Sequence, residues 1–258
     1  MIEAKNITKS FNNTKVLKDV SVSFEKGKTN LVIGQSGSGK TVLIKCMIGL
    51  HEVDSGRVTY DDRIFSDMKS RKKVGNKNER KNIRKEIGMM FQGGALFDSL
   101  TVVENVIFPL SMFTEMTEEE KLERASFCLK RVNLENVNQR FPAELSGGMQ
   151  KRVAIARAIS MKPKYLLCDE PNSGLDPKTA IVIDNLIHEI THEFNITTVI
   201  NTHDMNSVME IGDKIVFIHN GEKWWEGNKD NILETDNEEL NDFVYAAKYL
   251  KHLKNQTS

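Results

Sequence analysis

The sequence predicts an α/β fold with a core of mostly parallel strands, an antiparallel β subdomain and an inserted α-helical subdomain. A glycine-rich loop at residues 34–41 joins a short apolar strand to an apolar helix, as in the first crossover of an α/β core. Compact apolar runs at residues 87–91, 164–168 and 196–200 each end in polar residues, which is typical of buried parallel strands. Residues 93–145 instead read as helices, with apolar side chains at helical spacing.

Length and composition exclude several classes of protein. The chain has 258 residues, of which 39% are hydrophobic and 28% charged, so it can bury a substantial core. The formal net charge is zero, which gives no overall attraction to nucleic acid, and we expect no nucleic-acid partner. No apolar run approaches the roughly 18 residues that a membrane span requires, and no signal peptide is evident. We therefore expect a cytoplasmic protein unless a partner holds it at a membrane.

The glycine-rich loop has the pattern of a phosphate-binding loop, G-x-x-x-x-G-K-T. Glycines let bare backbone N–H groups approach a phosphate chain, and the following helix directs its N-terminus at the phosphates. The lysine would neutralise the β- and γ-phosphates, and the threonine hydroxyl would bind Mg²⁺. The motif consists of Gly34, Gln35, Ser36, Gly37, Ser38, Gly39, Lys40 and Thr41.

Residues 2–10 and 20–24 alternate between polar and apolar and predict antiparallel strands. Phe11 lies between them, either as a core aromatic at a strand end or as a ring that stacks on adenine. Residues 69–85 carry nine basic side chains and a single acid. A solvated loop and helix face is the favoured interpretation of this basic segment, and contact with lipid headgroups is the alternative.

Two features predict helix starts in the second half of the chain. Thr117 and Glu120 form a capping box at the start of a helix in the inserted subdomain. Ser146 suits the N-cap of another helix, and Gly147 and Gly148 give access to its free N–H groups. Capping alone explains the serine but not the two glycines, so we interpret this terminus as a second anion site.

Charged residues cluster where two of the buried strands end. Asp169 and Glu170 follow residues 164–168, at the sheet edge where α/β proteins bind ligands. We expect Asp169 to reach Mg²⁺ and Glu170 to accept a proton from an attacking water. His203 ends the strand at residues 196–200 at the same edge and could hydrogen-bond a γ-phosphate.

The last predicted helix begins at Asp236 and carries an apolar stripe. Docking on the chain's own core is the default interpretation, and contact with a second copy is the alternative. The stripe consists of Leu240, Phe243, Val244 and Ala247. The three cysteines, Cys46, Cys128 and Cys168, are far apart among apolar residues and are expected to be buried free thiols.

These motifs together resemble the ATP-binding-cassette (ABC) ATPases over nearly the whole chain. Five elements occur in the family's order: the phosphate loop, a glutamine loop at Gln92, the signature LSGGMQ, the strand YLLCDE and a switch histidine. The resemblance implies a RecA-like P-loop core over residues 1–228 with its helical subdomain at about 93–145, and a C-terminal helical extension over residues 229–258. It also implies an ATPase with ATP and Mg²⁺ as its substrate and cofactor.

Site roles follow from the resemblance position by position. Glu170 matches the general base, His203 the γ-phosphate switch, and Gln92 a ligand of Mg²⁺ beside Thr41 and Asp169. Phe11 matches the adenine-stacking aromatic, usually a tyrosine, and nucleotide contacts are also implied for Val16 and Val42. The remaining residues would reach the ATP of a second copy in a head-to-tail dimer: Ser146, Gly147, Gly148 and Asp176. The signature is usually LSGGQ, and Met149 here takes the glutamine position.

The segment after Gln92 predicts the cargo in this family, since it faces the membrane partner. The run Gly94-Ala95-Leu96-Phe97 and the methionine after the signature glycines resemble the ATPase of MCE-associated phospholipid transporters, which maintain outer-membrane lipid asymmetry. This resemblance implies a multi-span permease, an MCE-domain protein and a peripheral location on the cytoplasmic side of the inner membrane. The alternative is the ATPase of an amino-acid or methionine importer.

Overall fold

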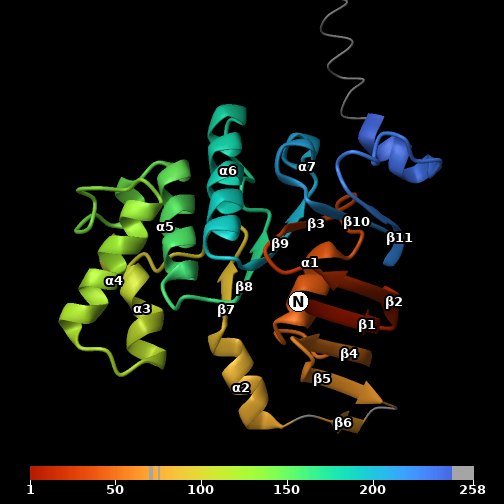
Figure 1. Cartoon of the computed structure of the whole chain (residues 1–258), viewed down its shortest axis with the longest axis horizontal. Coiled ribbons are helices and arrows are strands. Elements are labelled where there is room, and N and C mark those ends of the chain that lie inside the picture. The colour runs from red at the N-terminus through yellow and green to blue at the C-terminus, as the bar shows by residue number, and fades with distance from the viewer. Residues whose placement is uncertain (70–71, 75, 246–258) are drawn as a thin grey trace, which may run out of the picture.

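A computed structural model describes residues 1–69, 72–74 and 76–245 of the chain. Two sheets and a group of helices make up the molecule, with the helices α3, α4 and α5 on one side of the large sheet and the antiparallel strands on the other (Figure 1). The model therefore has the expected mixed α/β architecture. Within the described residues, no helix is long and apolar enough to cross a bilayer.

The large sheet has the strand order β11-β10-β3-β9-β8-β7. Five neighbouring strands run parallel, and only β11 pairs antiparallel with its neighbour β10. The strands are β3 (Thr29–Ile33), β7 (Ile87–Met90), β8 (Tyr165–Asp169), β9 (Thr197–Thr202), β10 (Lys214–His219) and β11 (Glu222–Gly227). Every residue of β3, β8 and β9 is buried, as in parallel strands covered on both faces, and β3 and β9 bury Thr and Asn side chains beside their apolar ones.

Side chains of the large sheet alternate between two cores. Leu31 and Ile33 of β3 point into one cluster of buried residues with Ile155 and Ile187, which belong to α5 (Gly147–Ile159) and α6 (Pro177–Glu193). Val32 points to the opposite cluster, shared with α1 (Lys40–Met47) and the antiparallel sheet. The large sheet therefore lies between two buried clusters. Its carboxyl edge holds the residues that follow each strand in fixed positions.

The antiparallel sheet has the order β2-β1-β4-β5-β6. Its strands are β1 (Ile2–Phe11), β2 (Thr14–Phe24), β4 (Ser55–Tyr60), β5 (Arg63–Lys69) and β6 (Lys72–Val74). The alternation at residues 2–10 and 20–24 predicted the first two strands, whereas β5 and β6 were not predicted. A signal was present, because Asp61 and Asp62 both adopt left-handed backbone angles (φ 46° and 65°), as a tight hairpin turn requires.

The helical subdomain contains α3 (Val102–Phe113), α4 (Glu118–Arg131) and a 3-10 turn at Pro142–Glu144, all between residues 93 and 145. The predicted capping box at Thr117 is present, since its hydroxyl accepts from the Glu120 N–H and the Glu120 carboxylate accepts from the Thr117 N–H. Ser146 caps α5 by accepting from the Met149 N–H at 3.3 Å. All three cysteines are free and buried, as expected.

The basic segment partly folds onto the protein. Helix α2 (Lys77–Lys85) lays the guanidinium groups of Arg80 and Arg84 over the ring of Phe65, at 5.0 and 5.8 Å from its centroid. Arg84 also donates to the Gly49 carbonyl at 3.1 Å. These two charges serve packing, whereas residues 70, 71 and 75 lie outside the described part of the chain, so lipid contact stays a prediction.

The last described helix covers residues 238–245 and differs in its cap from the prediction. The N-cap is Asn237 and not Asp236, because the Asn237 Oδ1 lies 2.8 Å from the Leu240 N–H and satisfies it. Leu240 and Val244 are buried in the core beside α6 and β10, so this helix docks on its own chain. Ala247 lies outside the described residues.

Two short helices lie next to candidate site residues. Helix α7 (Met205–Ile211) follows His203 closely, and α1 begins at Lys40, two residues earlier than the apolar run suggested. The last two residues of the phosphate-binding loop motif therefore belong to the first turn of a helix, where free N–H groups collect.

Candidate functional site

The candidate site lies where the parallel strands end. The phosphate-binding loop follows β3, Asp169 is the last residue of β8, and His203 follows β9 directly. Gln92 comes two residues after β7. Because these four strands run in one direction, their carboxyl ends meet at a single edge and bring together residues that are far apart in the sequence.

The loop itself requires glycine. Gly34, Gly37 and Gly39 have φ of 147°, 81° and 108°, a region that other residues rarely adopt. A Cβ at Gly34 would lie 2.2 Å from the Ile218 carbonyl oxygen of β10. A Cβ at Gly39 would lie 3.1 Å from the Val16 carbonyl oxygen, so β2 supports the loop from behind. The backbone is thus shaped to expose its N–H groups, and Val16 lies beside it.

The ammonium group of Lys40 is held inside this loop by backbone carbonyls. Its side chain is almost fully buried, and its Nζ donates to the carbonyls of Gly34 at 2.8 Å and Gln35 at 2.9 Å. Burial lowers the pKa of Lys40, while the charges of Glu170 and Asp169 oppose this shift. A buried ammonium held mainly by backbone carbonyls can turn to an anionic ligand, because a phosphate is a stronger partner than a neutral carbonyl.

Thr41 and Asp169 provide oxygen atoms for a cation. The Thr41 hydroxyl donates to Asp169 Oδ1 at 2.8 Å, and Asn201 Nδ2 donates to the same carboxylate oxygen at 2.5 Å and to Thr41 at 3.0 Å. Hydroxyl and carboxylate oxygens suit the hard Mg²⁺ ion. Among the described residues, Asn201 Oδ1 and Ser38 Oγ are buried without a hydrogen-bond partner. These unsatisfied groups and the glycine-lined loop fit a bound phosphate and its Mg²⁺.

Glu170 lies at the meeting point of three strand ends. Its Oε1 is 3.1 Å from His203 Nδ1, and its Oε2 accepts from Gln92 Nε2 at 3.4 Å. Its backbone is left-handed (φ 48°), a costly conformation for glutamate that recurs at functional sites. The structure therefore brings His203 and Gln92 to the carboxylate of Glu170, while the catalytic roles of Glu170 and His203 and the binding of Mg²⁺ by Gln92 stay predictions.

Five predicted nucleotide-binding residues lie outside this group. Phe11 is 39% exposed at the end of β1, and its ring contacts His51 edge-on with centroids 5.1 Å apart. Ser146 caps α5, Gly147 and Gly148 begin it, and a Cβ at Gly148 would lie 2.7 Å from Thr179 Cγ2 in the first turn of α6. Asp176 caps that same turn. Adenine stacking by Phe11 and contacts to a second copy's ATP stay predictions.

Sequence reasoning missed two residues at the site. Asn201 bridges Thr41 and Asp169, and the only signal was a polar residue at the end of a buried strand. Lys151 of α5 is buried, and its Nζ donates to Ser173 Oγ at 3.4 Å in the loop after Glu170. Burial lowers the pKa of Lys151, while the charge of Glu170 opposes the shift. No motif assigned either residue.

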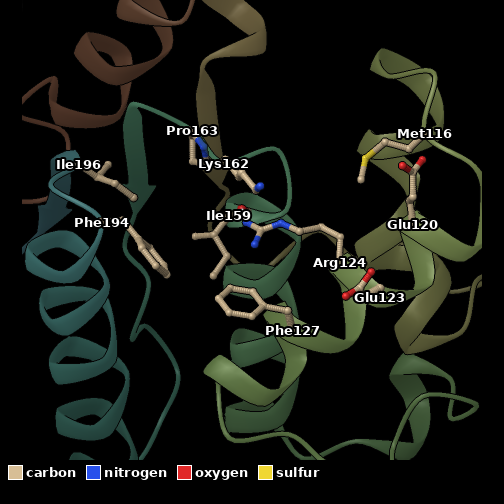
Figure 2. Close-up of a pocket in the computed structure, with 10 residues that line it drawn as sticks. All are labelled: Met116, Glu120, Glu123, Arg124, Phe127, Ile159, Lys162, Pro163, Phe194 and Ile196. Atoms are coloured by element: carbon tan, nitrogen blue, oxygen red, sulfur yellow. Dashed lines mark hydrogen bonds between the residues drawn. The ribbon is translucent and has the colours of Figure 1, made fainter.

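A cavity of about 660 Å³ lies away from the site, between the helical subdomain and the core (Figure 2). Its lining includes Pro163 and Ile196, which precede β8 and β9 and therefore mark the opposite edge of the sheet. Phe127 of α4 and Phe194 after α6 line it with ring centroids 6.5 Å apart. The cavity thus belongs to the junction of the subdomains and not to the phosphate-binding edge.

Comparison with known proteins identifies the family. A family model described as ABC transporter matches residues 17–173, which include the phosphate-binding loop, Gln92, the signature and Glu170. The chain belongs to the ABC transporter family. This ABC ATPase uses ATP with Mg²⁺, and its fold is that of the family's ATPase cassettes. The RecA-like core, the enzyme class and the cofactors expected from the sequence are confirmed.

Similar proteins span most of the chain. The methionine import ATP-binding protein MetN of Clostridium tetani is 40% identical over 84% of this chain, which spans 66% of that relative's length. The glutamine transport ATP-binding protein GlnQ of Escherichia coli is 36% identical, with 91% of this chain and 94% of the relative covered. The dimeric bacterial ABC transporter cassette MJ0796 superposes with a TM-score of 0.77 at 34% identity, covering 89% of this chain and 99% of that one.

The comparisons correct the cargo prediction. The relatives named above carry methionine and glutamine in their names, so the expected phospholipid transport is wrong and the MCE-domain partner is unsupported. The run at residues 94–97 and Met149 are too few positions to outweigh similarity over most of the chain. Ala95 and Phe97 are exposed, and Leu96 and Met149 are half-buried, so these side chains can vary with little effect on folding.

Proposed function

We propose that this chain is the ATP-hydrolysing subunit of an amino-acid importer of the methionine type. The observation that carries the proposal is the 40% identity, over 84% of the chain, to a protein named for methionine import. A second relative with that name, from Campylobacter jejuni, is 35% identical over 97% of the chain. Similarity of this extent takes in most of the chain.

The residues at the strand ends have distinct roles in the proposed hydrolysis. Glu170 accepts the proton of the attacking water, and His203 and Gln92 fix its carboxylate from both sides. Lys40 moves its ammonium from the loop carbonyls to the β- and γ-phosphates. Thr41 and Asp169 would hold Mg²⁺, which neutralises phosphate charge when bound. Asn201 orients both of these ligands.

Dimerisation completes the proposed site. Ser146 and Gly147 are exposed and Gly148 is half-buried at the start of α5, where the free N–H groups of a helix collect. In the proposed dimer, these N–H groups would bind the γ-phosphate of the ATP held by a second copy, and Asp176 would lie at the same interface. The dimeric MJ0796 cassettes, 33% and 34% identical to this chain, support this arrangement.

A permease is the proposed membrane partner, and an apolar hollow beside Gln92 is its proposed docking place. The hollow has a volume of about 480 Å³ and is lined by Phe91, Ala95 and the helices around them. Phe97, Phe108 and Phe113 of its lining are 42%, 38% and 50% exposed, which is unusual for phenylalanine. A helix of the permease would cover these rings, hold the chain at the cytoplasmic face of the membrane and move with the glutamine loop.

Reconstitution tests the proposal. The tagged chain is purified with its copurifying membrane proteins, placed in proteoliposomes with ATP, and assayed for uptake of labelled methionine and labelled glutamine. Methionine uptake that depends on ATP and is lost with Glu170→Gln supports the proposal. Uptake of glutamine without uptake of methionine would indicate a polar amino acid as the cargo. The chain covers 94% of the length of GlnQ, which favours this alternative. Absence of uptake of either amino acid would overturn the importer assignment.

A further inference from the structure

Two histidines and an aspartate form a cluster at the edge of the large sheet opposite to the phosphate-binding loop. His188 and His192 lie on the last turns of α6, and Asp213 lies between α7 and β10. One potential ligand atom from each of the three side chains lies within 4.8 Å of the other two. We propose that this cluster is a binding site for a divalent transition metal ion of the zinc type.

The helix places both histidines correctly. Residues four apart lie one above the other on a helix face, and their rings meet edge to face with centroids 4.3 Å apart. Pairs of histidines at this spacing on one helix are a recurrent zinc-binding arrangement. Imidazole nitrogen and carboxylate oxygen are also the ligand types that Zn²⁺, Co²⁺ and Ni²⁺ prefer, whereas Mg²⁺ prefers oxygen alone.

Contacts of Thr29 orient the cluster. The Thr29 hydroxyl lies 3.0 Å from His188 Nδ1, which leaves Nε2 as the ring nitrogen that Thr29 does not engage. The Thr29 N–H donates to Asp213 Oδ2 at 2.8 Å, so the first residue of β3 positions two of the three ligands. Second partners of this kind fix the ring orientation and the tautomer of metal-binding histidines.

The present geometry is close to coordination. His192 Nε2 lies 3.3 Å from Asp213 Oδ2, about the separation of two ligand atoms on one tetrahedral ion with bonds of ~2.0–2.2 Å. His192 has 45% of its side chain exposed and Asp213 has 24%, so an ion can enter and keep a water as a further ligand. The charges of two lysines act on the cluster: Lys28, whose ammonium is paired with Glu25 at 2.6 Å, acts on Asp213, and Lys229 acts on His188.

The position of the cluster predicts a structural role. Helix α6 is capped by Asp176 and ends near the histidines, while α7 begins after His203 and ends just before Asp213. A metal ion would therefore connect the C-terminal end of α6 to Asp213 after α7. These are the ends of the two helices that lie farthest from Asp176 and His203. Because the ion would bind only the folded chain, it would raise the melting temperature.

The experiment uses the full chain without a histidine tag, stripped with EDTA and dialysed. ZnCl2 is titrated by calorimetry, Co²⁺ binding is followed by its visible absorption, and melting is followed with and without ZnCl2. We expect one ion per chain and a melting temperature raised by about 5–10 °C when free zinc is ~100 times its dissociation constant. MgCl2 should give no such absorption or shift.

Matched variants locate the ion. His188→Gln and His192→Gln should each abolish tight binding of one ion, whereas His219→Gln should retain it. Thr29→Val keeps the shape but removes the hydroxyl, so affinity should fall roughly 10–100-fold. Melting in EDTA shows that each variant is folded. Binding of one zinc ion with unchanged affinity by the double variant His188→Gln/His192→Gln, or no binding by the wild type, would overturn the proposal and leave an ordinary histidine–aspartate ion pair.

Discussion

His203 Nδ1 lies 3.1 Å from Glu170 Oε1, which connects the end of one buried strand to the residue that follows its neighbour. Glu170 is largely enclosed, with 16% of its side chain exposed, whereas 61% of His203 is exposed. The carboxylate is therefore fixed by a residue that can itself reach a ligand from the solvent side. Loss of this contact should lower the rate of the chemical step more than it weakens the binding of ATP.

His203→Ala tests this relationship. Because the histidine orients the proposed base and would contact the γ-phosphate, we expect the turnover number of ATP hydrolysis to fall by on the order of 10²-fold, with little change in the Michaelis constant. Steady-state ATPase kinetics measure both quantities. His219→Ala is the matched control and should retain wild-type kinetics. A raised Michaelis constant at unchanged turnover would assign His203 to binding alone.

Asn201→Ala tests the bridge between Thr41 and Asp169. Removal of its Nδ2 leaves both oxygens free to move, so the Mg²⁺ concentration for half-maximal ATPase activity should rise by ~10–100-fold. The loss of these buried hydrogen bonds should also lower the free energy of unfolding by about 1–3 kcal/mol. A Mg²⁺ titration of ATPase activity and urea denaturation measure the two effects. An unchanged Mg²⁺ requirement would show that Asn201 is only structural.

Asp184 gives the protein a measurable pH dependence of stability. This carboxylate of α6 accepts from Ser207 Oγ at 2.7 Å and Asn172 Nδ2 at 3.0 Å, and its Oδ1 is buried without a partner within the described structure. Burial raises the pKa of Asp184 to about 6, although these two hydrogen bonds oppose the shift. The unfolded chain releases this proton near pH ~4.

The sign follows from proton binding. Between pH about 4 and 6 the folded chain holds a proton that the unfolded chain has lost, so this group stabilises the fold progressively as pH falls from about 8 to 5. Relative to Asp184→Asn, the wild type should gain ~1–3 kcal/mol over that range. Urea denaturation of both proteins across pH measures this difference. Parallel stability curves would contradict a raised pKa.

Gly88→Ala tests the packing of β7 against α5. Gly88 has an ordinary backbone, but an added Cβ would lie 2.3 Å from the Ala158 carbonyl oxygen and 3.2 Å from Pro163 Cγ. We expect a loss of about 1–3 kcal/mol in the free energy of unfolding, because the neighbouring backbone has to shift. Gly93→Ala is the comparison, since its Cβ would meet nothing and only its left-handed φ of 78° adds strain. An equal or smaller loss at Gly88 would contradict the close contact.

Much of this fold could be predicted from the sequence because its signals are local. Glycines at Gly34, Gly37 and Gly39 are dictated by backbone angles and close approach, and the continuous apolar runs reveal strands buried on both faces. The pairing of Glu170 with His203 was predictable because parallel strands end at one edge. The capping box at Thr117 was also predictable, because it depends only on four consecutive residues.

Other features depend on contacts that only the folded chain makes. Strands β5 and β6 lie in a segment rich in polar residues, and Phe65 of β5 packs against Arg80 and Arg84 of α2, a contact that no local pattern reveals. Asn201 and Lys151 gain their roles from residues far away in the sequence, Thr41 and Ser173. The cargo could not be inferred from Met149 and residues 94–97, because five positions weigh little against similarity to amino-acid importers over most of the chain.

The most direct test of the central claim is the ATPase activity of Glu170→Gln. The substitution keeps the shape of the side chain but removes the carboxylate that His203 and Gln92 position. We expect turnover to fall by ~10²–10⁴-fold, while ATP binding remains and a dimer with bound ATP accumulates on size-exclusion chromatography. Turnover near that of the wild type would contradict Glu170 as the general base and with it this account of the site.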